Sequence, residues 1–215
     1  MCFSAQASFT AAAVLSATGI AAITQVRERP QLPLALIPLI FGMQQLSEGI
    51  VWIELTEGHY SLWLRAATYS FLFFAQVAWP SWVPLSVLLM EKEKKRKNIL
   101  HILFTCGLLV SALLSWRLLT TNIHAQVHSH HILYNLVPGT LQTPVTVFYL
   151  ISAIAPFLIS GTGKIPLLGI ASLLSFIVTR IFYENFLVSV WCFFAAALSI
   201  MIIYILADLR AAKPA

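Results

Sequence analysis

Long apolar stretches alternate with short polar connections along the whole chain. Stretches of about 20 apolar residues are long enough to cross the hydrocarbon core of a bilayer as α-helices. The pattern predicts one all-α domain over residues 1–215, a polytopic membrane protein built as a bundle of seven transmembrane helices. The expected spans are 8–24, 32–54, 61–90, 98–116, 144–160, 165–183 and 186–207, with a long outer loop at 117–143.

Composition and charge predict that the bundle lies in a lipid bilayer and which end faces outward. With 59% hydrophobic and 10% charged residues, the chain cannot cover a water-soluble surface, so the lipid bilayer is the expected partner. Ten of the 13 Lys and Arg residues fall in every second connection, which by the positive-inside rule puts the N-terminus outside and the C-terminus inside. The net charge of +5 lies in short cytoplasmic loops and faces anionic lipid, so we expect no nucleic-acid partner. The basic exceptions are Arg65, Arg117 and Arg180.

Two prolines interrupt the third expected span. Pro80 and Pro84 lie well inside it. Each proline removes a backbone donor and its ring crowds the preceding turn, so we expect a kinked helix there.

Polar residues inside the expected spans predict a ligand site. Gln44, Gln45, Glu48 and Trp52 recur at three- to four-residue spacing, so they lie on one side of a helix near its outer end. A charge within the bilayer is costly unless it is paired or hydrated, which makes Glu48 a candidate functional group. We expect an outward-facing polar pocket that binds or senses a small ligand or a metal ion. Its expected residues are Gln44, Gln45, Glu48, Trp52, Arg65, Tyr69, Gln76, Tyr134, Arg180 and Glu184.

Four charged residues are expected at similar depth near the outer end of the bundle. They are Glu48, Arg65, Arg180 and Glu184, of which Arg180 and Glu184 are four residues apart and so able to pair on one helix. Two interpretations stay open. The four side chains either surround a ligand or form an ion-pair network that fixes the register of the helices.

Histidines give a second candidate site. The expected metal ligands are His124, His128, His130 and His131 in the long loop and His59 in the short outer loop. His124 and His128 would share one face of a helix, and imidazole suits Zn or Cu. Solvated loop histidines are the alternative. We also expect His131 and Tyr134 to hydrogen-bond over the pocket.

Two further functions follow from these residues. With a bound zinc, the protein would be a membrane-embedded hydrolase of a lipid or small amphiphile, with Glu48 as the catalytic general base. A small-molecule transporter would need polar residues continuing to the cytoplasmic side, where few occur. Haem and retinal are not favoured, because His101 is the one histidine within an expected span and no lysine lies in one.

Three short motifs resemble a family of small uncharacterised bacterial membrane proteins. They are the opening Met1-Cys2-Phe3-Ser4-Ala5, the stretch Gln44-Gln45-x-x-Glu48-Gly49-x-x-Trp52, and His130-His131-Ile132-x-Tyr134. The resemblance implies a multi-pass protein of the bacterial cytoplasmic (inner) membrane. It carries no activity, but it directs attention to the outer-end residues of these motifs.

Overall fold

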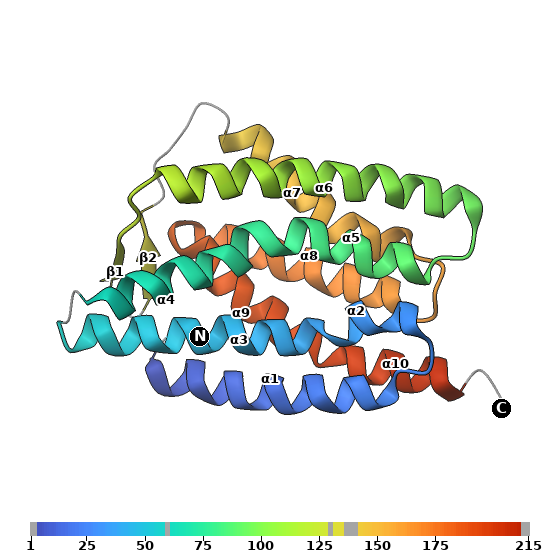
Figure 1. The fold of residues 1–215 in the computed structure, drawn as a ribbon, viewed down its shortest axis with the longest axis horizontal. Coiled ribbons are helices and arrows are strands. Elements are labelled where there is room, and N and C mark those ends of the chain that lie inside the picture. The colour runs from blue at the N-terminus through green and yellow to red at the C-terminus, as the bar shows by residue number, and fades with distance from the viewer. Residues whose placement is uncertain (1–3, 59–60, 129–130, 136–141, 212–215) are drawn as a thin grey trace.

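The computed structural model describes residues 4–58, 61–128, 131–135 and 142–211. Its helices run lengthwise in a bundle, and a short β-hairpin lies at one end (Figure 1). We call this the hairpin end. The helices are α1 (Ala5–Gln25), α2 (Leu32–Ala35), α3 (Ile37–Thr56), α4 (Leu62–Leu72), α5 (Trp79–Met90), α6 (Lys94–Thr120), α7 (Gln142–Ile159), α8 (Ile165–Phe182), α9 (Leu187–Ser199) and α10 (Met201–Ala211).

Six helical segments within the described residues are long and apolar enough to cross a membrane. They are Ala5–Gln25, Arg29–Thr56, Leu62–Met90, Lys94–Thr120, Ile165–Phe182 and Glu184–Ala211. The apolar helix Pro144–Ile159 is shorter. The fold is thus mostly helical, as expected. The helix α6 begins at Lys94, before the start of the fourth expected span at residue 98, and so includes several basic residues of the preceding connection.

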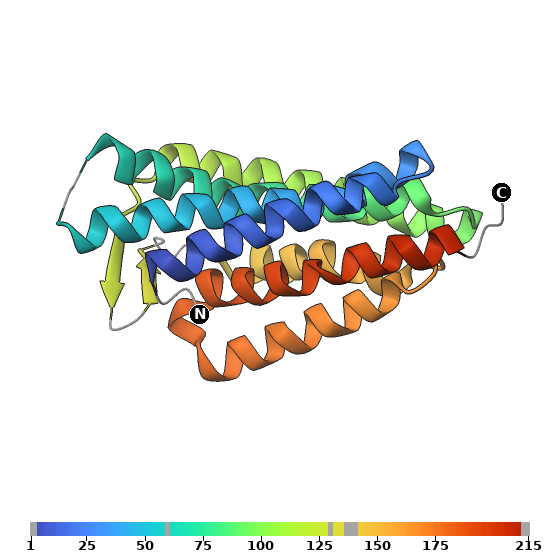
Figure 2. The same ribbon diagram turned by 90° about the horizontal axis from the view of Figure 1, so that it is seen from below.

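Basic residues gather at the end of the bundle opposite the hairpin, which we call the basic end. Figure 2 shows α1 beginning at the hairpin end and α10 finishing at the basic end. Arg210 of α10 donates to Gln25 of α1 at 3.1 Å, and Lys164 pairs with Asp208 at 2.9 Å. The connections that carry most of the Lys and Arg residues are therefore neighbours in space.

Glu91 joins two turns at the basic end. Its side chain is 6% exposed, and one carboxylate oxygen accepts from the Gly161 N–H at 2.8 Å in the α7–α8 turn. The other accepts from the N–H groups of Lys92 and Glu93 at 3.0 and 3.1 Å. Burial raises the pKa of Glu91, but the backbone donors and the Arg96 charge outweigh burial and lower it overall.

The expected kink takes the form of a π-helical segment, η2 (Phe73–Ala78), directly before Pro80. A proline cannot donate to the preceding turn, so carbonyls there need other partners. The Ala75 carbonyl accepts from the Tyr149 hydroxyl at 2.6 Å, and the Val77 carbonyl accepts from Ser111 Oγ at 2.7 Å. Two carbonyls of the distorted segment thus fasten α6 and α7 to this helix.

A strand pair replaces part of the expected long loop. The strands β1 (Ala125–His128) and β2 (His131–Tyr134) are antiparallel, with Ala125 opposite Tyr134 and His128 opposite His131. Buried Tyr134 stacks on Phe71 of α4 at 4.9 Å between ring centroids. The Tyr69 hydroxyl donates to the Thr121 carbonyl at 2.8 Å and so fixes the segment that enters the hairpin.

Candidate functional site

The middle of the bundle buries a group of polar side chains from α3. We call Gln44, Gln45, Glu48 and Trp52 the α3 polar cluster. The first three are 0% exposed and Trp52 is 4% exposed. Helix α1 packs closely against α3 because α3 has a glycine at the contact. At Gly42 even a methyl group would be too close, since its Cβ would lie 2.8 Å from Ser16 Oγ of α1.

Neighbouring helices hydrogen-bond to the α3 polar cluster. Ser189 of α9 donates from its hydroxyl to Glu48 Oε1 at 2.6 Å, and Gln45 Nε2 donates to Glu48 Oε2 at 3.4 Å. The Trp79 indole N–H of α5 donates to Gln44 Oε1 at 3.0 Å. The cluster therefore ties three helices together and fixes the position of the Glu48 carboxyl group.

Several polar atoms of this region find no hydrogen-bond partner among the described residues. They are Gln45 Oε1, Trp52 Nε1 and Ser8 Oγ. A buried polar group without a partner destabilises a fold by about 1–3 kcal/mol, and such groups need an explanation beyond packing.

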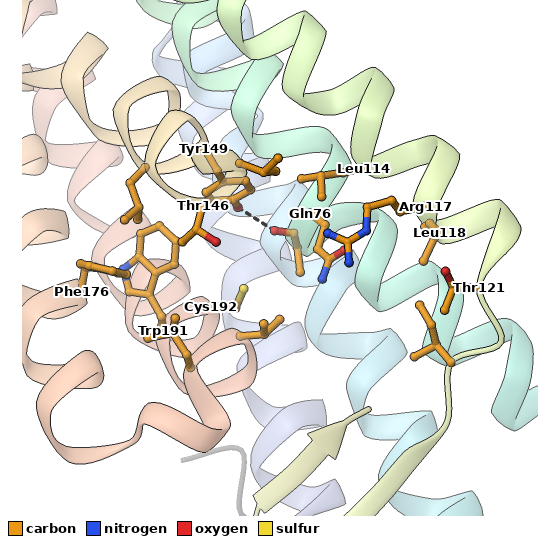
Figure 3. Close-up of a pocket in the computed structure, with 16 residues that line it drawn as sticks. Gln76, Leu114, Arg117, Leu118, Thr121, Thr146, Tyr149, Phe176, Trp191 and Cys192 are labelled. Atoms are coloured by element: carbon orange, nitrogen blue, oxygen red, sulfur yellow. Dashed lines mark hydrogen bonds between the residues drawn. The ribbon is translucent and has the colours of Figure 1, made fainter. Parts of the chain in front are cut away.

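A cavity of about 190 Å³ lies beside the cluster, towards the hairpin end. It is lined by η2, α6, α7, α8 and α9 and by residues 121 and 123 before the hairpin (Figure 3). Its wall is mainly apolar. The polar side chains on it are Gln76, Arg117, Thr121, Thr146, Tyr149, Trp191 and Cys192.

The charged side chain and the aromatic rings of the wall lie apart, and Leu114 and Leu118 lie beside the arginine. Figure 3 shows Gln76, Arg117 and Thr121 on one side and Phe176 and Trp191 on the other. Arg117 is the one charged residue among the described residues that line the cavity. The cavity is therefore suited to a molecule with one polar end and one apolar end.

A second, smaller cavity of about 50 Å³ lies next to the first, deeper in the bundle. The two share Tyr149, Trp191 and Cys192, and the second is lined by core residues such as Val83 and Phe157. Cys192 is buried and lies next to Gln44, so it separates the cavities from the α3 polar cluster. The cluster thus stands behind the cavity wall.

The structure brings together only part of the expected pocket. Gln76 lines the cavity, whereas the other expected pocket residues do not. Arg65 is exposed and lies over the Tyr69 ring at 5.8 Å. Arg180 and Glu184 form an ion pair as expected, but their side chains are 51% and 66% exposed. The expected convergence of all four charges on one site is wrong, because only Glu48 points into the core.

The histidines do not lie on a common helical face. His128 ends a β-strand and His124 precedes it, so their four-residue separation runs along an extended chain. His131 stacks on Phe186 at 4.5 Å between ring centroids. No group of three or more His, Cys, Asp or Glu side chains that could hold a metal ion occurs within the described residues. His59 and His130 lie outside those residues, and a zinc or copper site stays a prediction.

Apart from Gln76, the cavity residues were not expected from the sequence. Tyr149 and Phe176 are ordinary apolar-span residues, and Cys192 is typical of core packing. Arg117 did stand out, because it breaks the charge pattern of the connections. The unusual position of this charge could have marked Arg117 as a candidate site residue. Only the packing of α6 against α7 shows that it borders a cavity.

The chain belongs to a family of unknown function (DUF6629), whose family model matches residues 1–215. This confirms membership in an uncharacterised family, which was expected from the motifs. Neither a curated protein nor a solved structure matches the chain. The assignment of function therefore rests on the site.

Proposed function

We propose that this chain is an integral protein of the bacterial cytoplasmic membrane that binds a small ligand in the cavity between η2 and α6–α9. The observation that carries the proposal is the cavity of about 190 Å³ towards the hairpin end of the bundle. A concave, mainly apolar cavity with a few convergent polar side chains is the usual form of a small-ligand site. In our proposal the chain crosses the bilayer seven times and its hairpin end faces outward.

The size of the cavity limits the ligand. An apolar cavity of about 150 Å³ is enough to hold benzene. A cavity of about 190 Å³ therefore accommodates an aromatic ring or a short alkyl chain with a small head group. Thr146 lines the cavity and is exposed, which supports entry alongside α7.

The α3 polar cluster contributes to this proposed function by fixing one side of the cavity wall. Glu48 is bonded to Ser189, one turn before Cys192 on α9, and Cys192 lines the cavity. A wall fixed by buried hydrogen bonds keeps its shape without a ligand, which lowers the entropic cost of binding. The proposed role of Glu48 is thus to position the wall.

A cavity-filling substitution tests the proposal. Val188 lines the cavity, and Val188→Trp would fill much of it. The matched control is Val178→Trp on α8, where the side chain is 43% exposed and does not line the cavity. Binding is measured by equilibrium dialysis of phenylbutanol against protein in lipid nanodiscs, with uptake by empty nanodiscs subtracted.

The wild type and Val178→Trp are expected to bind about one phenylbutanol per chain, and Val188→Trp is expected to bind none. The unfolding temperature of each variant shows whether it is folded. Equal uptake by wild type and a folded Val188→Trp, or no uptake beyond empty nanodiscs, would refute binding in this cavity.

A further inference from the structure

From the two sides of the cavity wall we infer the class of the ligand: an amphiphile with one acidic head group at Arg117 and an apolar body against Trp191. This inference rests on the proposed function, since it needs the cavity to be a binding site. It adds the charge of the ligand and the direction in which it lies.

The charge follows from what lines the cavity. Arg117 contributes a permanent positive charge, and no Asp or Glu is among the described lining residues. The guanidinium is half-buried near the C-terminal end of α6. Away from bulk water, attraction between opposite charges is stronger, so an anion gains more here than at an exposed arginine.

The groups beside Arg117 suit an acidic head group. Gln76 and Thr121 line the same side of the cavity and offer an amide and a hydroxyl that can donate (Figure 3). The Tyr69 hydroxyl holds the Thr121 carbonyl at 2.8 Å and accepts from the Ile123 N–H at 3.4 Å. The segment that carries Thr121 is therefore already in place before a ligand arrives.

The apolar body has its own place opposite the arginine. Trp191 is tilted edge-on to Phe176, with ring centroids 5.2 Å apart, and both line the cavity. On the other face of Trp191 lies the second cavity, which is lined by Val83, Phe157 and Ile202. A ligand with its acid at Arg117 thus places its apolar body against Trp191 and Phe176.

The position of Gln76 depends on the local backbone. Gln76 lies within the π-helical segment η2, which changes the direction of side chains relative to a regular α-helix. The carbonyl of the preceding residue, Ala75, is held by Tyr149, which also lines the cavity. The same proline-induced distortion therefore shapes the backbone on which the polar side of the site is built.

A pair of probes that differ in charge tests the inference. Phenylbutanoate carries the acid, and phenylbutanol is its neutral counterpart. Both are measured by equilibrium dialysis against the full chain in uncharged lipid nanodiscs. Phenylbutyl phosphate is included to tell a carboxylate site from a phosphate site.

The wild type is expected to bind one of the two acids about tenfold to a hundredfold more tightly than the alcohol, as for hydrogen bonds to a charged group. Arg117→Gln should remove this preference while leaving phenylbutanol binding intact, and Arg117→Lys should keep much of it. The matched control Arg65→Gln, at an exposed arginine that does not line the cavity, should change nothing.

Three outcomes distinguish a wrong ligand charge from a wrong binding function. If acid and alcohol bind equally and Arg117→Gln alters neither, the cavity is a site but the inferred charge is wrong. If Arg117→Gln weakens both probes to the same degree, the arginine only supports the fold and the inference is again overturned. If no probe binds the wild type, the proposed function fails as well.

Discussion

Replacing Glu91 by Gln should loosen the basic end of the bundle. One oxygen of Glu91 accepts two backbone N–H groups within its own turn, and the other accepts the Gly161 N–H. Gln has a single acceptor oxygen, so it can serve only one of these two sets. The amide group would then face a backbone donor. Losing a buried hydrogen bond to a charged group costs about 1.5–3 kcal/mol.

Thermal unfolding of the purified protein in detergent measures this loss. For a chain of this length, about 2 kcal/mol corresponds to a fall of roughly 4–8 °C in unfolding temperature. Glu93→Gln is the matched control, because Glu93 is 49% exposed and pairs with Arg96 on the surface. Exposed ion pairs contribute little, so we expect a change of about 1 °C or less.

The effect of Glu91 should also depend on pH. Its pKa is lowered in the folded protein, so the carboxylate contributes full stability above the pKa of the unfolded chain. That contribution is lost as pH falls through the folded-state pKa. The wild type should therefore lose its advantage over Glu91→Gln at pH values below about 4. Equal unfolding temperatures for Glu91→Gln and Glu93→Gln at neutral pH would refute the account of this contact.

Three other substitutions test contacts around the site. Gly107→Ala should destabilise the protein by about 1–3 kcal/mol, because the new Cβ would lie 1.8 Å from the Pro80 carbonyl oxygen; thermal unfolding checks this. Tyr149→Phe should lower stability by about 1–3 kcal/mol, since it leaves a carbonyl of η2 without its hydroxyl donor, and faster hydrogen exchange in η2 should accompany it. Ser189→Ala removes the donor at 2.6 Å from Glu48 and should lower the unfolding temperature by several degrees, whereas Ser189→Thr should retain most of it.

The sequence predicted the helices better than the site. Apolar runs are a strong signal, because every backbone polar group in a bilayer must be bonded within its own segment. The spacing of Gln44, Gln45 and Glu48 pointed to the polar stretch of α3 that the structure buries. The prolines at 80 and 84 indicated a distorted helix, although not a π-helical one.

The cavity could not be found from spacing along one helix. Gln76, Arg117 and Trp191 come from three elements that are distant in sequence and meet only through packing. Arg180 resembled Arg117 in the sequence, because both are charged residues near the end of an expected span. Arg180, however, is exposed on α8 and pairs with Glu184. The hairpin was missed for a related reason: its strands of four residues each carry too short a pattern to be recognised.

A crystal structure of the chain with bromophenylbutanoate tests the central claim most directly, because the anomalous scattering of bromine locates the probe. The account predicts a single bromine peak beside Trp191 and Phe176, with the carboxylate towards Arg117. A separate open groove between α6 and α7 is lined by His101 and Phe148. A bromine peak only in that groove, with the cavity between η2 and α6–α9 unchanged, would contradict the account.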